Sequence, residues 1–348
     1  MPGPEVQAMM QAALDFLEAG RAAAGDGARL YIVADAGRDR NIRTLLQGLA
    51  EESASLYQGE ALAEYGDEAP WLATAGPHGG LWSWLIEEGL GRRWGVFLVS
   101  HRDFDSVRRH LRRFVKIRTW EDQLVYFRFF DPFIWNSQVG FLSAEQRRHL
   151  FDGIDLTMTE LGDQGFMRLR LEADDRFAAR IIEPKPDGGI ATTDRLQSLP
   201  GIDLAGSGIR PFLTLTRAQM EAPLLFNRPM LVEHVLDHLR PDHGQRMSFF
   251  PEGAQRSMVN RGIELAFSYG ISDLAHIRLF CDLMWRMAPG FHRQQQITAV
   301  LRRTDLPAER RFDILADDRY ADAWVEAEEL RDFKDWFPDL PRPQGTTP

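Results

Sequence analysis

Four arginines crowd into six consecutive positions of this chain. They are Arg108, Arg109, Arg112 and Arg113, and Lys116 follows them. A guanidinium group presents its N–H donors as a planar fork, which binds a carboxylate through two hydrogen bonds at once. The pattern therefore predicts recognition of acidic groups, and these four arginines are our candidate partner-binding residues. The alternative is the ordinary solvated face of a packed helix.

Two aspartates and one further arginine form a second candidate cluster. Arg128 stands in a run of apolar residues, so we expect its side chain to be partly buried. A buried guanidinium needs a carboxylate partner, because an unpaired charge in a core is very costly. Either Asp35, at the end of an expected strand, or Asp131 would supply it. We expect a structural ion pair here, and the alternative is a hydrolase-like site that uses Asp35, Arg128 and Asp131 in a cleft.

Other motifs in the sequence fall short of a complete catalytic or metal-binding set. His234 and His238 lie four residues apart, but EHVLDH lacks the HExxH order of a zinc protease. The Gly-Ser-Gly run at 206–208 is not the GxSxG turn that presents a nucleophilic serine. Cys281 lies among apolar residues, as a small core side chain does. We therefore expect no catalytic residue, no bound metal and no cofactor.

The arginines are positioned by an expected strand and helix. Residues 96–99 are a continuous apolar run, typical of a strand that is covered on both faces. Either Ser100 or Asp103 would cap the helix that follows. An apolar stripe recurs along this helix at spacings of three and four residues: Phe104, Val107, Leu111 and Phe114. The stripe predicts one buried face, with the arginines to one side of it.

Strand and helix patterns alternate in the first part of the chain, which indicates an α/β fold. We expect an N-terminal lobe with a mixed sheet flanked by helices at 1–140. A connecting segment at 141–210 would hold a short strand pair and a linker rich in proline and glycine. A mainly helical C-terminal lobe at 211–340, with one helix over 252–268, and a frayed tail at 341–348 complete the chain.

Composition limits the classes of partner and the location. The 348-residue chain carries a net charge of −10, which disfavours general nucleic-acid binding, and one cysteine, which excludes an internal disulfide. No apolar run approaches the roughly 20 residues of a membrane-spanning helix. The acidic N-terminal sequence lacks the basic region of a signal peptide. We expect a cytoplasmic protein that binds no nucleic acid and no membrane.

Charge is unevenly distributed along the sequence. Residues 101–118 hold seven Lys or Arg against two Asp, a local balance of +5. Residues 316–348 hold nine Asp or Glu against four Lys or Arg, a local balance of −5. These two segments could pair within the molecule, or each could face a partner.

Seven short sequence blocks occur in order over about residues 29–133. They are YIVAD (31–35), SLYQGE (55–60), APWL (69–72), LWSWLIEEG (81–89), WGVFLVS (94–100), VRRHLRRF (107–114) and RFFDP (128–132). Together they resemble the adaptor chaperones of bacterial type VI secretion (Tap/TEC-like proteins), a former domain-of-unknown-function family. The chain departs from the family pattern at Phe133, where members commonly have arginine.

The resemblance implies a protein that is not an enzyme. Such adaptors bind a toxic effector in the cytoplasm, often through the effector's N-terminal region, and help to load it onto a VgrG-type spike protein. The expected partners are therefore an effector and a VgrG-type spike protein, and no cofactor is implied.

Overall fold

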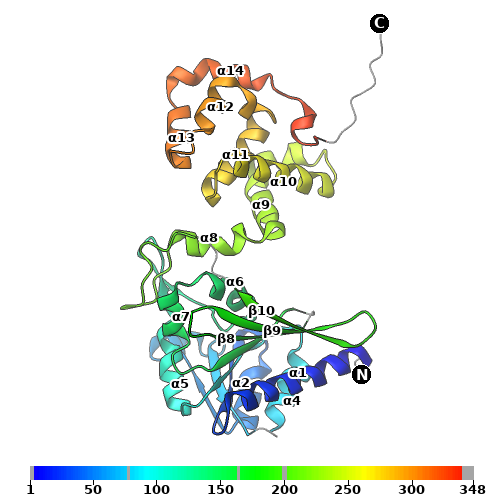
Figure 1. Ribbon diagram of the computed structural model, residues 1–348, viewed down its shortest axis with the longest axis vertical. Helices are drawn as coiled ribbons and strands as arrows, with labels where there is room; N and C mark the ends of the chain where they lie inside the picture. The colour runs from blue at the N-terminus through cyan, green and yellow to red at the C-terminus, as the bar shows by residue number, and fades with distance from the viewer. Residues whose placement is uncertain (1–3, 77–78, 163–164, 198–201, 339–348) are drawn as a thin grey trace. The chain divides into compact units, whose positions relative to one another are not determined.

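The computed structural model describes residues 4–76, 79–162, 165–197 and 202–338 (Figure 1). The chain divides into two compact units, 1–220 and 221–348, and the division lies within helix α8 (Arg217–Leu225). The expected class is confirmed, because a lobe with a helix-flanked sheet precedes a mainly helical lobe.

Within the described residues, the first unit contains an eight-stranded sheet in the order β10-β9-β8-β7-β4-β1-β3-β2. Its strands are β1 (Arg29–Asp35), β2 (Glu52–Ser55), β3 (Pro70–Thr74), β4 (Gly95–Ser100), β7 (Leu156–Glu160), β8 (Phe166–Leu171), β9 (Phe177–Pro184) and β10 (Ile190–Gln197). Neighbouring strands of this sheet pair antiparallel, so the described sheet is antiparallel throughout rather than mixed as expected. Strands β5 (Lys116–Arg118) and β6 (Leu124–Tyr126) form a separate antiparallel pair.

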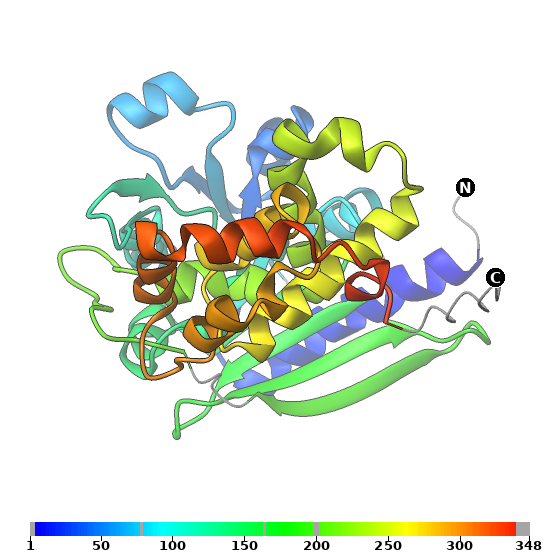
Figure 2. The ribbon, with the colours of Figure 1, turned by 90° about the horizontal axis from the view of Figure 1, so that it is seen from above.

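Helices pack on both faces of the sheet. They are α1 (Pro4–Ala24), α2 (Asn41–Leu49), α4 (Gly80–Gly89), α5 (Phe104–Leu111), α6 (Pro132–Gln138) and α7 (Ala144–Leu150), whereas the short helix α3 (Glu60–Tyr65) has no buried residue. Successive residues of a strand point to opposite faces, so Leu30 and Ile32 of β1 join a core with α1, α2 and α4. Tyr31 and Val33 join a second core with α5, α6 and α7. In Figures 1 and 2, α1 (blue) lies against the green strands of the sheet.

The sheet continues beyond the expected lobe boundary at residue 140. Within the expected connecting segment, 141–210, strands β7 to β10 add to the same sheet, and β8 and β9 are the predicted strand pair. The reason is that β4 offers a free edge to β7, where Phe97 pairs with Met158, and Met158 is fully buried. The unit therefore ends at 220 rather than at 140. The expected tail at 341–348 lies outside the described residues.

The second unit is helical over its described part. Its longer helices are α9 (Arg228–Met247), α10 (Glu252–Ser268), α11 (Leu274–Arg286), α12 (Gln295–Leu301), α13 (Ala308–Leu315) and α14 (Ala321–Glu328). They enclose one core cluster, in which Ile277 and Phe280 are fully buried. Among the described residues of the whole chain, no helix combines the length and the apolar character needed to cross a membrane.

Glu160, at the end of β7, is a buried carboxylate held by a backbone loop. Its side chain accepts a hydrogen bond from the N–H of Gly91 at 2.7 Å, and the N–H groups of Arg93 and Trp94 also bond to it. Burial nevertheless raises the pKa of Glu160 to about 7, because the loss of hydration outweighs these bonds. The carboxyl therefore takes up a proton in the folded state more readily than in the unfolded chain.

We expect Glu160→Gln to remove a pH-dependent loss of stability. A raised pKa means that folding becomes less favourable as the pH rises from the unfolded value, 4.5, to about 7. Across this window, wild type should lose about 3 kcal/mol of unfolding free energy relative to the variant, at 1.36 kcal/mol per pKa unit. Urea denaturation at several pH values measures the difference. Glu87→Gln, on the exposed side of α4, should keep the wild-type slope; equal slopes in wild type and Glu160→Gln would contradict the prediction.

Candidate partner-binding surface

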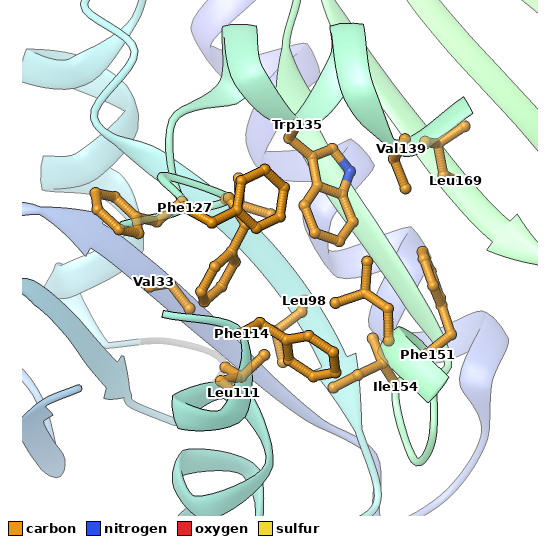
Figure 3. Packing of buried hydrophobic residues seen from close by; sticks show 14 of the residues in the cluster. Val33, Leu98, Leu111, Phe114, Phe127, Trp135, Val139, Phe151, Ile154 and Leu169 are labelled. Atoms are coloured by element: carbon orange, nitrogen blue, oxygen red, sulfur yellow. The ribbon is translucent and has the colours of Figure 1, made fainter. Parts of the chain in front are cut away.

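The arginine-bearing helix forms as its sequence predicts. Asp103 caps α5, because its side chain accepts a hydrogen bond from the N–H of Ser106 at 2.8 Å. The whole apolar stripe is buried in the core shared with the sheet, and Figure 3 shows Leu111 and Phe114 within that core, near Leu98. The last turn tightens into a 3-10 segment, η2 (Arg112–Phe114). The stripe thus fixes which side of the helix the arginines occupy.

Two of the four candidate arginines bond to the protein's own backbone. The Nε and Nη2 groups of Arg108 donate to the carbonyl oxygen of Ser55, at 3.0 and 2.8 Å. The Nε of Arg112 donates to the carbonyl oxygen of Leu56 at 3.2 Å. Both carbonyls lie where the edge strand β2 ends. Arg108 and Arg112 therefore tie this edge of the sheet to α5, a role that the sequence pattern did not indicate.

The other two candidates point to solvent. Arg109 and Arg113 are exposed, and neither side chain forms an ion pair or a hydrogen bond with the described residues. A guanidinium without a partner keeps all its donors available for a ligand. The candidate partner-binding surface is thus carried by Arg109 and Arg113 on the outer side of the helix.

Beside η2, the first unit has a groove of about 590 Å³, here called the basic groove. Its walls come from the segment after β2, from η2, β5 and β6, and from the loop at 209–213. Its cationic lining residues are Arg112, Arg113, Lys116 and Arg210. Only the first two were candidates from the sequence. Lys116 follows the same helix, whereas Arg210 lies about a hundred positions further on, where no local pattern links it to the others.

The second candidate cluster, with Asp35, Arg128 and Asp131, assembles around Arg38, a residue that the sequence pattern did not indicate. The Nη2 of Arg38 donates to Oδ2 of Asp131, and its Nε lies 3.4 Å from Oδ2 of Asp35. The Nη2 of Arg128 donates to the same oxygen of Asp35. The side chains of Asp35 and Asp131 are only 2% and 7% exposed. Both carboxylates are thus engaged by guanidinium groups, which is the arrangement of a structural ion-pair cluster.

The expected partial burial of Arg128 is wrong, since its side chain is 51% exposed. The apolar run around it is not one continuous strand. Strand β6 ends at Tyr126, and the chain then turns toward the start of α6. Arg38 has the more enclosed guanidinium, with a side chain that is 29% exposed. Its place three residues after Asp35, in the turn that ends β1, is the signal that could have identified it.

Burial raises the pKa of Asp35, although the charges of Arg128 and Arg38 and a hydrogen bond from the N–H of Gly37 oppose the shift. Asp131 accepts from the N–H of Phe133 at 2.9 Å and so caps α6. Each aspartate thus begins a helical turn as well as joining the cluster.

The remaining motifs lie in structural settings. The ring of His234 contacts the guanidinium of Arg278 within the second unit. Cys281 is 1% exposed, as predicted for a core residue, and burial raises the pKa of its thiol to about 12. Residues 206–208 lie in a loop, and Gly208 at its end forms an isolated antiparallel bridge with Thr214. In the described ranges, no group of three or more His, Cys, Asp or Glu side chains is placed to hold a metal.

One comparison with known proteins gives a match. Residues 30–149, about a third of the chain, match the family model described as "Domain of unknown function (DUF4123)". This range contains the seven sequence blocks described above, together with α5 and the four candidate arginines at 108, 109, 112 and 113. Neither curated proteins nor solved structures gave a match.

Proposed function

We propose that this protein is a cytoplasmic adaptor chaperone that binds an effector of a type VI secretion system and promotes its loading onto a VgrG-type spike protein. It acts by binding, not by catalysis, and it needs no cofactor. The effector engages the outer side of α5, where Arg109 and Arg113 meet carboxylates of the effector's N-terminal region.

The observation that carries the proposal is the exposed, unpaired state of Arg109 and Arg113 in a rigid setting. The opposite side of the same segment is fixed in the core by Leu111 and Phe114, so the backbone positions from which the two arginines project are set before a partner arrives. A preorganised surface loses less conformational entropy on binding than a flexible one.

The sequence blocks supply the biological setting of the proposal. They resemble type VI secretion adaptors, and the matching family model covers the same part of the chain. Two carboxylates of the acidic C-terminal segment bond within the second unit itself. Asp335 pairs with Arg293 at 2.7 Å, and Glu326 accepts from Gln294 at 2.9 Å.

The proposal is tested by co-purification with the products of the neighbouring genes. The wild-type protein should retain one of them, an effector, in a complex that weakens as ionic strength rises. The double variant Arg109→Glu, Arg113→Glu should fold normally and bind roughly tenfold or more weakly, with a flatter dependence on salt, because exposed charges mainly set association rate and salt sensitivity.

Arg40→Glu is the matched control, because Arg40 is an exposed arginine of the same unit outside the surface. It should bind as wild type does. Retention of no neighbouring gene product by the wild-type protein would contradict the adaptor function. Unchanged binding by the double variant would show that the arginines are only a solvated face.

A further inference from the structure

We propose that the basic groove is the docking site for an acidic segment of the partner that carries an apolar or aromatic anchor. The inference rests on the proposed function and adds a location and a ligand chemistry to it. It also adds residues that lie outside the candidate helix, above all Lys116 and Arg210.

The charge of the groove is the first argument. Four of its lining residues are cationic and none is an aspartate or a glutamate, although the whole chain carries a net charge of −10. The groove thus has no carboxylate in its lining, although the whole chain contains 51 Asp and Glu residues. Such a site favours an anionic ligand, because the like-signed charges of the free groove repel one another and a carboxylate relieves this repulsion.

The cations are displayed by ordered backbone. Arg210 lies in a loop closed by two hydrogen bonds between Gly208 and Thr214, at 2.8 and 3.2 Å. The N–H of Leu215 then bonds to the carbonyl of Arg118 on β5 at 3.0 Å. Arg210 and Arg113 are exposed, and neither side chain has an ion-pair partner in the described residues. The groove therefore presents separate charges from two distant parts of the chain.

Aromatic rings give the groove an apolar wall. Tyr126 is 43% exposed, and its ring centroid lies 5.3 Å from that of Tyr57. The Nζ of Lys116 lies 5.0 Å from the centre of the Tyr126 ring, which holds the ammonium over the aromatic face. Phe212 completes the lining on the loop side. An anchor side chain would pack on these rings while flanking carboxylates reach the cations, the arrangement of an apolar contact with a charged rim.

The groove measures about 590 Å³. Ligand sites of about 300–1,000 Å³ bury a drug-sized molecule, so the groove has room for a few side chains of a peptide. A peptide is favoured over a nucleic acid by the charge outside the groove. A polyanion gains affinity from many phosphate contacts along a basic surface, whereas the net charge of this chain is −10. A segment with a few carboxylates needs only the local cations.

His149 offers a local reporter of occupancy. Burial lowers its pKa, Arg113 and Arg210 lower it further, and Asp152 and Glu145 oppose them. Its ring also meets that of His110, with centroids 6.4 Å apart. An anion in the groove would offset the two arginine charges, so the pKa of His149 should rise on binding.

The test uses fluorescence anisotropy with a labelled twelve-residue peptide in which glutamates and aspartates flank one phenylalanine and one leucine. A second peptide has glutamine and asparagine in place of the acids, and a third is acidic without the apolar residues. Wild type should bind the first peptide best and the amide peptide roughly tenfold or more weakly, since the amides carry no charge. Labelled oligothymidylate is the fourth probe.

The variant Lys116→Glu, Arg210→Glu should weaken binding of the first peptide by roughly tenfold or more, because attraction becomes repulsion at two sites. The milder pair Lys116→Gln, Arg210→Gln should give an intermediate loss, which guards against a folding defect. Arg40→Glu should bind as wild type does. NMR titration of the histidine ring protons should show the His149 pKa rising only with the first and third peptides.

The outcomes separate this inference from the proposed function. Equal binding of the acidic and amide peptides, preferential binding of oligothymidylate, or unchanged binding by both groove variants would overturn the inference. If an effector co-purifies equally well with wild type and with the groove variants, the adaptor function would stand. The assignment of the groove as the docking site would then be contradicted. If the groove binds the acidic peptide but no effector co-purifies, the groove inference would stand and the adaptor function would be contradicted.

Discussion

Replacing Arg147 with methionine is expected to lower the free energy of unfolding of the first unit by about 3 kcal/mol. Arg147 lies on α7 and is 1% exposed. Its guanidinium donates to the carbonyl oxygens of Leu142 and Asp175, both at 3.0 Å, and to that of Gly140. One buried side chain thus satisfies three backbone carbonyls from two segments of the chain.

The size of the effect follows from opposing contributions. A buried carbonyl left without a donor costs roughly 1–3 kcal/mol; the bond to Leu142 is buried, and the bonds to Asp175 and Gly140 are partly buried, so each of these two costs less. Methionine recovers part of this loss, because it avoids the cost of burying a charge. That cost is visible in the native protein, where burial lowers the pKa of Arg147 to about 10. The contact of the guanidinium with the ring of Phe177, 4.7 Å from its centroid, is also lost.

Arg148→Met is the matched control on the next position of α7. Its side chain is 62% exposed and pairs with the carboxylate of Asp175 at 2.9 Å. Exposed pairs of this kind contribute about 1 kcal/mol or less, so the control should unfold close to wild type. Urea denaturation gives the free energies, and hydrogen exchange of α7 locates the loss. Equal stabilities for the two variants would contradict the role assigned to Arg147.

Arg38→Met is expected to destabilise the protein by about 2–3 kcal/mol, and Arg128→Met by less than about 1 kcal/mol. Arg38 contacts both buried aspartates of its cluster, whereas Arg128 contacts Asp35 alone. Without Arg38, Asp131 has no guanidinium partner among the described residues. Without Arg128, Asp35 keeps Arg38. The estimate for Arg38 lies below that for a fully buried pair, because its side chain is 29% exposed.

The defect of Arg38→Met should grow as the pH rises. The folded-state pKa of Asp35 is already raised above 3.8 by burial, and the shift is opposed most by Arg128 and to a smaller extent by Arg38. Its removal raises this pKa further. An acid with a raised folded pKa destabilises the fold increasingly as the pH rises through that window, so the deficit should be smaller near pH 4 than at about pH 7.

Thermal and urea denaturation of wild type and the two variants at both pH values provide the measurement. A larger loss for Arg128→Met than for Arg38→Met would restore the assignment that the sequence alone suggested. A deficit of Arg38→Met that shrinks at the higher pH would show that the buried carboxylates are not its cause.

Local periodicity was enough to predict the parts of this protein that depend on neighbours in sequence. The stripe from Phe104 to Phe114 identified the buried side of α5, and the apolar run at 96–99 identified a strand covered on both faces. Helix α10 spans residues 252–268, as predicted. The outward direction of Arg109 and Arg113 follows from the same periodicity. Each of these features depends on which residues an element must bury. Apolar residues repeat every two residues in a half-buried strand and every three to four in a helix, so a short stretch of sequence is enough to identify the buried side.

Only the tertiary structure decided which distant groups meet. Strand β7 was missed because a five-residue strand gains its identity from the free edge of β4. Arg108 and Arg112 bond to carbonyls more than fifty positions away, and Arg38 meets Asp131 across 93 positions. Lys116 and Arg210 share a groove for the same reason. Hydrogen bonds and charges act over a few ångströms in space, so the chain path, not the local pattern, selects their partners.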